Sequence, residues 1–500
     1  MDAADALIGR RQELYERFPV APVAWSANGR AVEFAGPVAL GLGIGGLAIV
    51  EPDDGRLIVV HVRDVRIAER DGPRIEELGL DSDSHDAASA ASITISMRYV
   101  RGDGVVLGRL DPQGFELTTE SYPFGEDLIR PATTDEVGTV IDAIDGDQPT
   151  IGVGWLRDYP GVKARLHSRG FSRHTFMCGQ SGSGKTYTTG VLFERLLAHS
   201  SLPVMVLDPN SDHVHLGSLA DPDDPAPEAA FYRRVMDSVS VSRARGLDST
   251  FTLCVDFSDL EPEVQAALLR LDPIADLDDY NALLQVTSGL GETYSITDVA
   301  HASGAAETSA GLARRIENLR LDRWGLWKRP GETSATEADA ISRRFVVADL
   351  GSLTTPDERT AVALAVLGNR WRARRNRQPV LLAIDEAHNV LPASTDNPLL
   401  RAASETGVLI AGEGRKFGLH LFIASQRPGK VHPNVISQCD NLILMRMNGA
   451  GDIANLETQF SHVPASLLRQ SLGFGLGQAL FAGRIAPVPL LAQVGQRLTP

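Results

Sequence analysis

The stretch Gly179-Gln-Ser-Gly-Ser-Gly-Lys-Thr186 decides the fold of this 500-residue chain. It fits the pattern G-x-x-x-x-G-K-[ST] in full. An apolar stretch, Thr175-Phe-Met-Cys178, leads into it, and a helical stretch at 188–199 leads out. Glycines let the backbone curl so that its N–H groups converge on phosphate at a helix N-terminus. The sequence therefore predicts a phosphate-binding loop between a buried strand and a helix.

This loop predicts that the chain binds the nucleotide ATP together with Mg²⁺. Lys185 is expected to reach the β- and γ-phosphates, and the Thr186 hydroxyl is placed to bind Mg²⁺. Only five lysines occur in the chain, so a Gly-Lys-Thr match by chance is improbable. The expected nucleotide-binding residues of the loop are Gly179, Gln180, Ser181, Gly182, Ser183, Gly184, Lys185, Thr186 and Tyr187.

A second apolar strand, Val380–Ile384, ends in the letters D-E-A-H. Those letters are compatible with a helicase box, with another kind of ATPase, or with a strand that has a polar end. Given the phosphate-binding loop upstream, we expect Asp385 to bind the nucleotide and its Mg²⁺, and Glu386 to polarise the attacking water. His388 is interpreted as structural, and the four-letter match as incidental.

A third strand, Leu421–Ser425, also ends in polar residues. Parallel strands bring their carboxyl ends to the same edge of a sheet, where ligands bind. Gln426 is therefore a candidate γ-phosphate sensor with a catalytic role. Ser425 and Arg427 are weaker candidates, because either could simply fix the end of the strand.

The chain changes its pattern near residue 150. Beyond it, apolar strands alternate with helical patterns, which predicts a parallel sheet with crossover helices. Residues 259–340 have helical spacing throughout and are interpreted as a helical insertion. The expected strands are His174–Gly179, Val204–Asp208, Thr252–Phe257, Phe345–Asp349, Val380–Asp385, Leu419–Ser425, Leu442–Met447 and a late pair, Ala479–Phe481 and Val488–Val494.

The first 150 residues are instead rich in short strands with glycine turns, which favours a small barrel. Asn28-Gly29 between two alternating stretches predicts a hairpin. Arg101-Gly-Asp-Gly-Val105 suggests another hairpin. The polar stretch 81–89 is expected to be an exposed, mobile loop.

Charge and cysteine content limit the possible partners and the cell compartment. The chain has a net charge of −16, and residues 1–150 hold 13 Arg and no Lys against 27 Asp and Glu, a net of −14. Any contact with DNA must therefore be a local basic lining rather than a basic surface over the whole molecule. The three scattered cysteines predict buried, reduced thiols. No signal-peptide or membrane-spanning pattern is evident, so a cytoplasmic protein without a membrane partner is expected.

The combined motifs resemble the HerA family, within the broader HerA/FtsK group of DNA-pumping ATPases. The matching stretches cover most of the chain: "GVGWLRDYPGV", "RHTFMCGQSGSGKT", "VLDPNSDH", "LLAIDEAHNVLP", "EGRKFGLHLFIASQRPGKVHPNVISQCDNLILMRM" and "GQALFAGRIAPVPLLAQV". The resemblance implies an α/β fold with a RecA-like P-loop ATPase core and a helical insertion, preceded by a small N-terminal β-barrel. The implied domains are the barrel at 1–150, the core at 151–258 and 341–475, the insertion at 259–340, and bracing strands at 476–500.

The resemblance also implies an activity and partners. Family members are homohexameric rings, and Arg415 matches their arginine finger, which enters the neighbouring subunit's site; Lys416 is a less favoured finger. Asp208 and Asn210 fall where relatives place polar residues near the nucleotide. The implied function is an ATP-driven ring that translocates double-stranded DNA as a helicase-type motor. It would work with a NurA-like nuclease or a sirtuin-like effector, in DNA end processing or anti-phage defence in a bacterium.

Two other functions stay open. In the first, the ring is an assembly platform that switches a partner effector enzyme and pumps little DNA itself. The acidic first 150 residues are a plausible docking surface for a basic partner. A conjugation or secretion ATPase is less favoured, because such proteins usually carry membrane segments or docking extensions.

Overall fold

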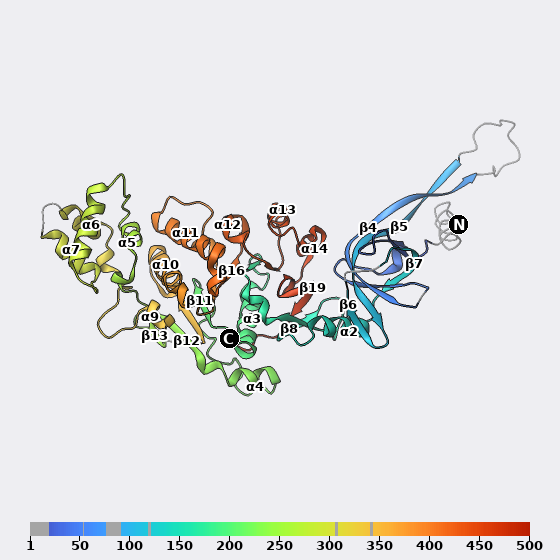
Figure 1. Cartoon of the computed structure of the whole chain (residues 1–500), viewed down its shortest axis with the longest axis horizontal. Coiled ribbons are helices and arrows are strands. Elements are labelled where there is room, and N and C mark those ends of the chain that lie inside the picture. Colours follow the sequence, from blue (N-terminus) through green and yellow to red (C-terminus); the bar gives the residue numbers. More distant parts are fainter. Residues whose placement is uncertain (1–19, 54, 77–91, 119–121, 306–308, 341–343) are drawn as a thin grey trace, which may run out of the picture. The chain divides into compact units, whose positions relative to one another are not determined.

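The computed structural model describes residues 20–53, 55–76, 92–118, 122–305, 309–340 and 344–500. It divides the chain into two compact units (Figure 1). The barrel unit comprises Met1–Gly146 with Asp158–Val162, and the sheet unit comprises Asp147–Arg157 with Lys163–Pro500.

Six antiparallel strands of the barrel unit close on themselves in the order β2-β1-β7-β3-β4-β5, with β5 pairing back onto β2. Alternating side chains, among them Val32, Phe34, Val50 and Val60, fill the interior. The predicted barrel and the hairpin at Asn28-Gly29 are thereby confirmed. The elements are β1 Val23–Ser26, β2 Ala31–Gly36, β3 Leu47–Glu51, β4 Leu57–Glu76, β5 Ser92–Asp111, β6 Gly114–Leu117, β7 Phe124–Pro131 and α2 Thr134–Asp145.

The predicted hairpin at Arg101–Val105 is wrong, because β5 runs straight through it. The glycines of this stretch allow neighbouring strands to approach closely, and they do not form a turn. A Cβ atom on Gly102 would lie 2.3 Å from the Asp64 carbonyl oxygen, and one on Gly104 would lie 2.6 Å from Val60 Cγ1. The polar stretch 81–89 lies outside the described residues.

The sheet unit is built on a twelve-stranded sheet in the order β13-β12-β14-β11-β15-β16-β10-β17-β18-β19-β8-β9. The eight strands from β10 to β17 pair in parallel, and β18, β19, β8 and β9 add an antiparallel edge beyond β17. The strands are β8 Thr150–Leu156, β9 Lys163–His167, β10 Thr175–Cys178, β11 Val204–Asp208, β12 Val239–Arg243, β13 Phe251–Thr252, β14 Phe345–Asp349, β15 Val380–Ile384, β16 Leu419–Ser425, β17 Asn441–Leu444, β18 Gln478–Gly483 and β19 Ala486–Val494.

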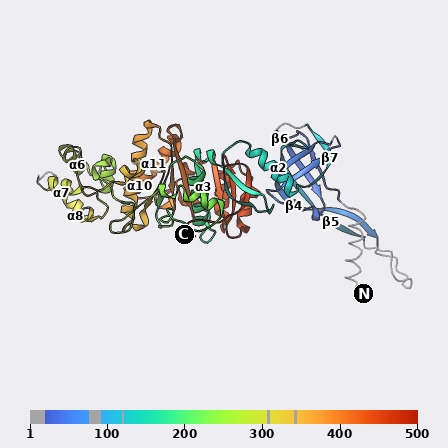
Figure 2. The same cartoon turned by 90° about the horizontal axis from the view of Figure 1, so that it is seen from below.

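Helices cover this sheet and extend beyond one end of it. Phe193 of α3 packs on Phe345 and Phe422 of the sheet, with ring centroids 5.5 and 5.6 Å apart. Helices α5–α8, from the stretch predicted as an insertion, gather at the end of the unit beyond α10 and α11 (Figures 1 and 2). The helices are α3 Lys185–His199, α4 Pro227–Arg233, α5 Pro262–Leu268, α6 Leu277–Gly289, α7 Ile296–Gly304, α8 Ala310–Asn318, α9 Ala335–Ala340, α10 Pro356–Arg372, α11 Pro398–Glu413, α12 Pro433–Ile436, α13 Ala450–Gln459 and α14 Ala465–Gln470.

One predicted strand is largely wrong, and three strands, β8, β9 and β12, were not predicted. The prediction at Thr252–Phe257 reduces to the short β13, after which Val255 forms only an isolated bridge to Trp327. The strand β12 has the sequence Val-Ser-Val-Ser-Arg, whose alternating serines are typical of a half-exposed strand, yet Ser240 and Ser242 are buried. Because its serines are polar, the sequence pattern of β12 did not predict a strand inside the sheet.

Candidate functional site

The phosphate-binding loop joins β10 to α3 as predicted. Gly182 and Gly184 have φ of +73° and +93°, a left-handed conformation that glycine adopts at little cost. Within the loop, the Ser183 N–H donates to the Gln180 carbonyl at 3.0 Å and closes a turn. The Gln180 N–H in turn donates to the carbonyl of Arg446. The loop thus has the curled backbone that phosphate binding requires.

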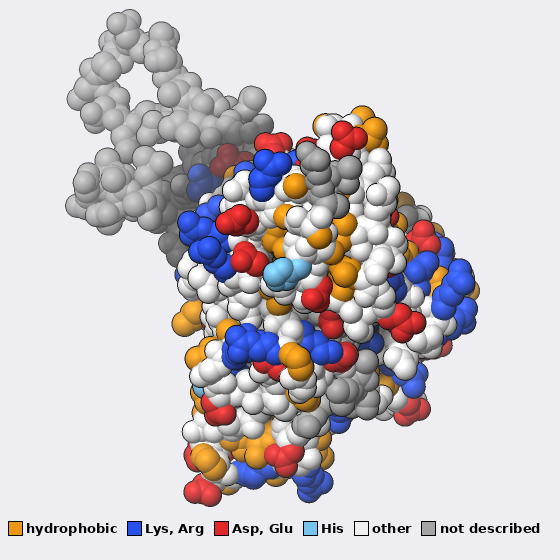
Figure 3. All heavy atoms as spheres, turned by 90° about the vertical axis from the view of Figure 1, so that its left-hand side faces the viewer, with side chains coloured by type: hydrophobic (Ala, Val, Ile, Leu, Met, Phe, Trp, Pro, Cys, Tyr) orange, Lys and Arg blue, Asp and Glu red, His pale blue; other side chains and the backbone are white. Residues whose placement is uncertain are grey.

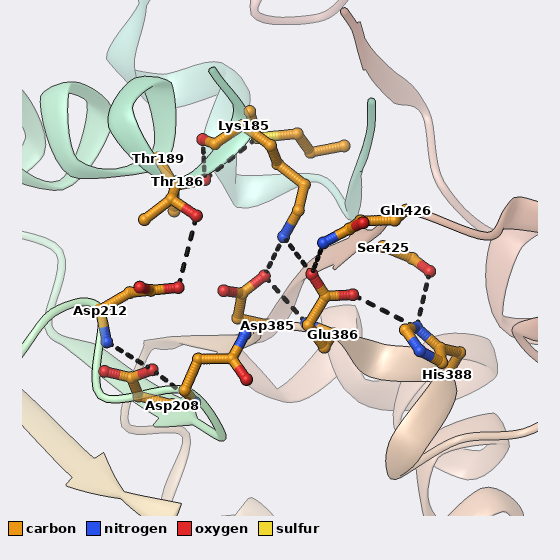
Figure 4. A network of polar contacts seen from close by, with 12 residues as sticks. Lys185, Thr186, Thr189, Asp208, Asp212, Asp385, Glu386, His388, Ser425 and Gln426 are labelled. Atoms are coloured by element: carbon orange, nitrogen blue, oxygen red, sulfur yellow. Dashed lines mark hydrogen bonds and ion pairs between the residues drawn. The ribbon is translucent and has the colours of Figure 1, made fainter. Parts of the chain in front are cut away.

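The strand order brings three polar strand ends to this loop. Strand β16 lies between β10 and β15, so its polar end falls between the phosphate-binding loop and the carboxylate pair. Figure 4 shows Lys185, Asp385, Glu386 and Gln426 pointing toward one another. These four predicted residues, more than 200 positions apart at the extremes of sequence, form one cluster.

Lys185 lies at the centre of this cluster and is only 5% exposed. Its Nζ lies 2.5 Å from Asp385 Oδ1 and 3.0 Å from Glu386 Oε1. Gln426 Nε2 donates to the same Glu386 oxygen at 2.7 Å. Burial by itself lowers the pKa of Lys185, but the charges of Asp385 and Glu386 outweigh it and raise that pKa. Lys185 is therefore a fixed cation that orders both carboxylates.

Each carboxylate keeps one buried oxygen, Asp385 Oδ2 and Glu386 Oε2, that accepts no hydrogen bond. Buried polar atoms are normally paired, so these oxygens are suited to a cation or a water. No cluster of three or more metal-binding side chains occurs among the described residues. Mg²⁺ commonly takes one or two protein ligands and fills the rest of its shell with phosphate and water oxygens, so the unpaired Asp385 Oδ2 is an atom of this cluster that suits it.

Glu386 has an unusual backbone conformation, with φ of 43° and ψ of 47°. A non-glycine residue in the left-handed region costs on the order of 1 kcal/mol or more, and such residues cluster at active sites. Its N–H donates to Asp385 Oδ1 at 2.9 Å. The turn therefore presents two consecutive carboxylates to the same space, although adjacent residues of an extended strand point to opposite faces.

His388, which the sequence predicted to be structural, contacts the cluster. Its Nδ1 lies 3.1 Å from Ser425 Oγ and 3.4 Å from Glu386 Oε2 (Figure 4). Burial lowers the pKa of His388, so the imidazole is neutral at pH 7. Arg427 takes part only through its N–H, which donates to Ser425 Oγ. These residues fix the ends of β15 and β16 relative to each other.

Asp212 is a functional candidate that no sequence motif predicted. The Thr186 hydroxyl lies 3.3 Å from Asp212 Oδ2, on the side of the site next to Asp385 (Figure 4). Burial, followed by the nearby charge of Asp385, raises the pKa of Asp212. The only signal for Asp212 in the sequence was its place in the polar stretch after β11. Within that stretch, the neighbouring Asp208 and Asn210 were predicted to lie near the nucleotide instead.

Asp208 shapes that loop and does not contact the P-loop lysine. Its carboxylate accepts hydrogen bonds from the N–H groups of Asn210, Asp212 and His213 at 2.8–3.2 Å. Burial raises the pKa of Asp208 to about 6, against the effect of these donors. Asn210 is exposed.

Arg415 is not brought to the site within this chain. It lies in the turn Gly414–Phe417 before β16, at the opposite edge of the sheet from Gln426. Its Nη1 donates to Asp440 Oδ2 at 2.6 Å. Another arginine, Arg446, donates to the Gly182 carbonyl of the phosphate-binding loop at 3.0 Å, although it belongs to none of the predicted site motifs.

The parallel sheet carries this phosphate-binding loop, the strand-end carboxylates and, between them, a strand with a polar end. This arrangement defines a RecA-like P-loop ATPase, an ATP-dependent enzyme. Residues 151–340 match the family model for the helicase HerA central domain. Along most of its length the chain is also similar to a HerA helicase.

Curated relatives and solved structures have low sequence identity to the chain. The DNA double-strand break repair helicase HerA of Pyrococcus furiosus is 20% identical over 94% of this chain and 91% of its own length. The HerA of Saccharolobus solfataricus is 22% identical over 67% of this chain and 66% of its own. Among solved structures, VirB4 of Thermoanaerobacter pseudethanolicus is 17% identical, with a TM-score of 0.47 over 70% of this chain and 98% of its own. The conjugative coupling protein TrwB is 10% identical, also with a TM-score of 0.47, over 74% and 93%.

Proposed function

We propose that this ATPase is a homohexameric ring motor that hydrolyses Mg²⁺-ATP to translocate double-stranded DNA. The observation that supports it most is the convergence of Lys185 and Gln426 on Glu386. A general base must be held within hydrogen-bond reach of its water, and this arrangement orders the Glu386 carboxylate with two donors.

The residues divide the chemistry between them. Lys185 neutralises charge on the β- and γ-phosphates, and the loop Gly179–Thr186 binds them through its N–H groups. Thr186 and Asp385 would hold Mg²⁺, which neutralises phosphate charge when bound. Glu386 takes a proton from the attacking water, while Gln426 senses the γ-phosphate. Tyr187 follows the loop and is 42% exposed, so it is available to the nucleotide.

DNA as the substrate rests on the relatives, which are named DNA double-strand break repair helicases. On the face of the sheet unit shown in Figure 3, Lys and Arg side chains are interspersed with Asp, Glu and apolar side chains. That face has no single-sign basic surface. A basic lining inside a ring remains the expected place for DNA contacts.

The ring would also need Arg415 from a neighbouring subunit. Arg415 is 32% exposed, pairs with Asp440 and lies away from its own subunit's site, so it is accessible to a second copy of the chain. A planar guanidinium from a neighbour can stabilise the charge on a transferring phosphoryl group.

The proposed partner is a separate NurA-like nuclease or sirtuin-like effector, in DNA end processing or anti-phage defence in the cytoplasm. None of the helices in the described ranges is long and apolar enough to cross a bilayer. The net charge of −14 on residues 1–150 favours a second candidate, a platform on which a basic effector docks and is switched by hydrolysis.

One experiment separates the two candidates. ATP hydrolysis by the purified full-length ring is measured with and without linear double-stranded DNA and with and without the candidate effector. Stimulation by DNA together with displacement of a labelled triplex strand supports the motor. Hydrolysis that ignores DNA but changes with the effector supports the platform and rejects the motor.

A further inference from the structure

The segment 496–499, which follows β19, lies along one face of the phosphate-binding helix α3. Its partners on α3 are Tyr187, Gly190 and Glu194, spaced i, i+3 and i+7, so they share one helical face. The helix that begins at the phosphate-binding loop is therefore contacted from Tyr187 to Arg195 by a segment more than 300 positions away in sequence.

A buried carboxylate anchors this segment. Glu194 is fully buried and accepts hydrogen bonds from the Leu498 N–H at 3.0 Å and from the Thr499 N–H and hydroxyl at 2.8 and 2.7 Å. Arg195 donates to the Gln496 carbonyl at 3.1 Å. A buried charge is costly unless it is hydrogen-bonded, so Glu194 strongly favours the docked segment.

Close packing fixes Arg497 against the helix. A Cβ atom on Gly190 would lie 2.6 Å from Arg497 Nε, so a larger residue there would displace the guanidinium from the place where it crosses the helix. Arg497 then links two parts of the nucleotide site. Its N–H donates to the Tyr187 hydroxyl at 2.7 Å, and its Nη2 donates to the Asp212 carbonyl at 3.2 Å.

Through these two hydrogen bonds, Arg497 keeps Thr186 and Asp212 close to each other. Tyr187 directly follows Thr186, and the carboxylate of Asp212 lies 3.3 Å from the Thr186 hydroxyl. That distance is long for a hydroxyl donor, but active-site hydrogen bonds are often long before the ligand binds. A hydroxyl has one proton and two lone pairs. If Asp212 accepts the proton, a lone pair of Thr186 faces away from Asp212 and is free to bind a cation.

We propose that Asp212 and Arg497 are positioning residues for Mg²⁺: Asp212 orients the Thr186 hydroxyl, and Arg497, held by the segment 496–499, keeps Asp212 and α3 in register. The proposal rests on the function proposed above, because it assigns Thr186 to the metal. Outer partners of metal ligands typically change metal affinity by about 10- to 100-fold when removed.

The test measures binding rather than turnover. A non-hydrolysable fluorescent ATP analogue is titrated onto the full chain carrying Glu386→Gln, first in EDTA and then at increasing Mg²⁺. Asp212→Ala removes the acceptor, Asp212→Asn keeps an acceptor oxygen in the same shape, and Arg497→Ala removes the link. Arg469→Ala is the matched control, because Arg469 is an exposed arginine paired with Glu457 away from the site.

We expect equal affinity for the analogue in EDTA for all variants. The Mg²⁺ concentration for half-maximal tightening should rise about tenfold or more in Asp212→Ala. It should rise less in Asp212→Asn and Arg497→Ala, and stay unchanged in Arg469→Ala. An unchanged Mg²⁺ requirement in Asp212→Ala, or an equal loss of affinity in EDTA, overturns this inference alone. Failure of the unsubstituted chain to bind the analogue at all overturns the proposed function as well.

Discussion

Lys185 Nζ lies 2.5 Å from Asp385 Oδ1, although the two residues are 200 positions apart and both are almost fully buried. This ion pair joins the phosphate-binding loop to the end of β15. Because Lys185 also lies 3.0 Å from Glu386, one cation compensates two carboxylates in a buried site. The pair thus contributes to stability as well as to the proposed chemistry.

Replacing Lys185 with Met should therefore destabilise the sheet unit, because it leaves two buried carboxylates without their cation. Removal of one partner from a buried ion pair typically costs about 3–5 kcal/mol. The free energy of unfolding can be measured by urea denaturation. The double variant Lys185→Met/Asp385→Asn should recover part of the loss. Lys328→Met, which breaks a partly exposed pair with Glu337, should cost no more than about 1 kcal/mol. A cost that small for Lys185→Met would contradict the ion pair's structural role.

Four buried histidines predict that acid destabilises the protein. Burial lowers the pKa of His61, His213 and His420 to about 4 and that of His174 to about 3. The unfolded chain binds these protons near the ordinary value of 6.5, so stability is present above pH 6.5 and is lost as pH falls toward 4. Each histidine contributes a slope of about 1.4 kcal/mol per pH unit within that window. Asp208, whose pKa is raised to about 6, opposes this trend, because its contribution is lost as pH rises through 6.

His174→Gln isolates one of these contributions. The ring bonds the Ala411 carbonyl and accepts from the Leu421 N–H, so the variant should lose about 1–3 kcal/mol at pH 7. Its stability should then fall less steeply than that of the unsubstituted chain between pH 6.5 and 4.5, as followed by thermal unfolding. The control is His301→Gln, an exposed histidine of α7. If His174→Gln kept the full slope, His174 would not be a source of acid sensitivity.

Arg415→Ala subunits should poison rings of otherwise unsubstituted subunits, because each would deprive its neighbour of a cation for the transferring phosphoryl group. ATP hydrolysis is measured over a series of mixing ratios. Loss greater than the fraction of variant subunits is expected. Asp440→Asn is the matched control, since it breaks the same ion pair but keeps Arg415. Strictly proportional loss, or equal poisoning by Asp440→Asn, would reject the assignment.

Gly104→Val should destabilise the barrel unit, because its Cβ would lie 2.6 Å from Val60 Cγ1 and 2.7 Å from the His61 carbonyl oxygen. Overpacking of this kind commonly costs about 1–3 kcal/mol. Gly138→Ala in α2 is the contrasting variant. A Cβ there meets nothing within 4 Å, so the change should stabilise the helix by up to about 1 kcal/mol. Thermal unfolding of both variants checks the pair. Equal stability would show that β5 does not approach β4 this closely.

The sequence predicted the parts of the site that are contiguous motifs. Gly179–Thr186, Asp385-Glu386 and Gln426 each follow an apolar strand, so local pattern and strand order together place them at one edge. Asp212 and Arg497 could not be found in this way, because only tertiary packing joins them to Thr186.

The fold shows the same division. Long apolar strands such as β11 and β15 were predicted within one residue, because every side chain in them is buried. Strand β12 was missed since its serines are buried within the sheet, and Arg101–Val105 was read as a turn since glycine marks both turns and close strand contacts.

The measurement that tests the central claim most directly is the fate of ATP on the Glu386→Gln variant. Glutamine keeps the shape of the side chain and an oxygen for Lys185 and Gln426, but it is not a base. Binding of labelled ATP and its conversion to ADP are followed in a single turnover at saturating Mg²⁺ and DNA. We expect ATP affinity within about threefold of the unsubstituted chain and hydrolysis reduced by about 10²-fold or more. Hydrolysis at the unsubstituted rate would contradict the role of Glu386, and with it the site on which the proposed motor depends.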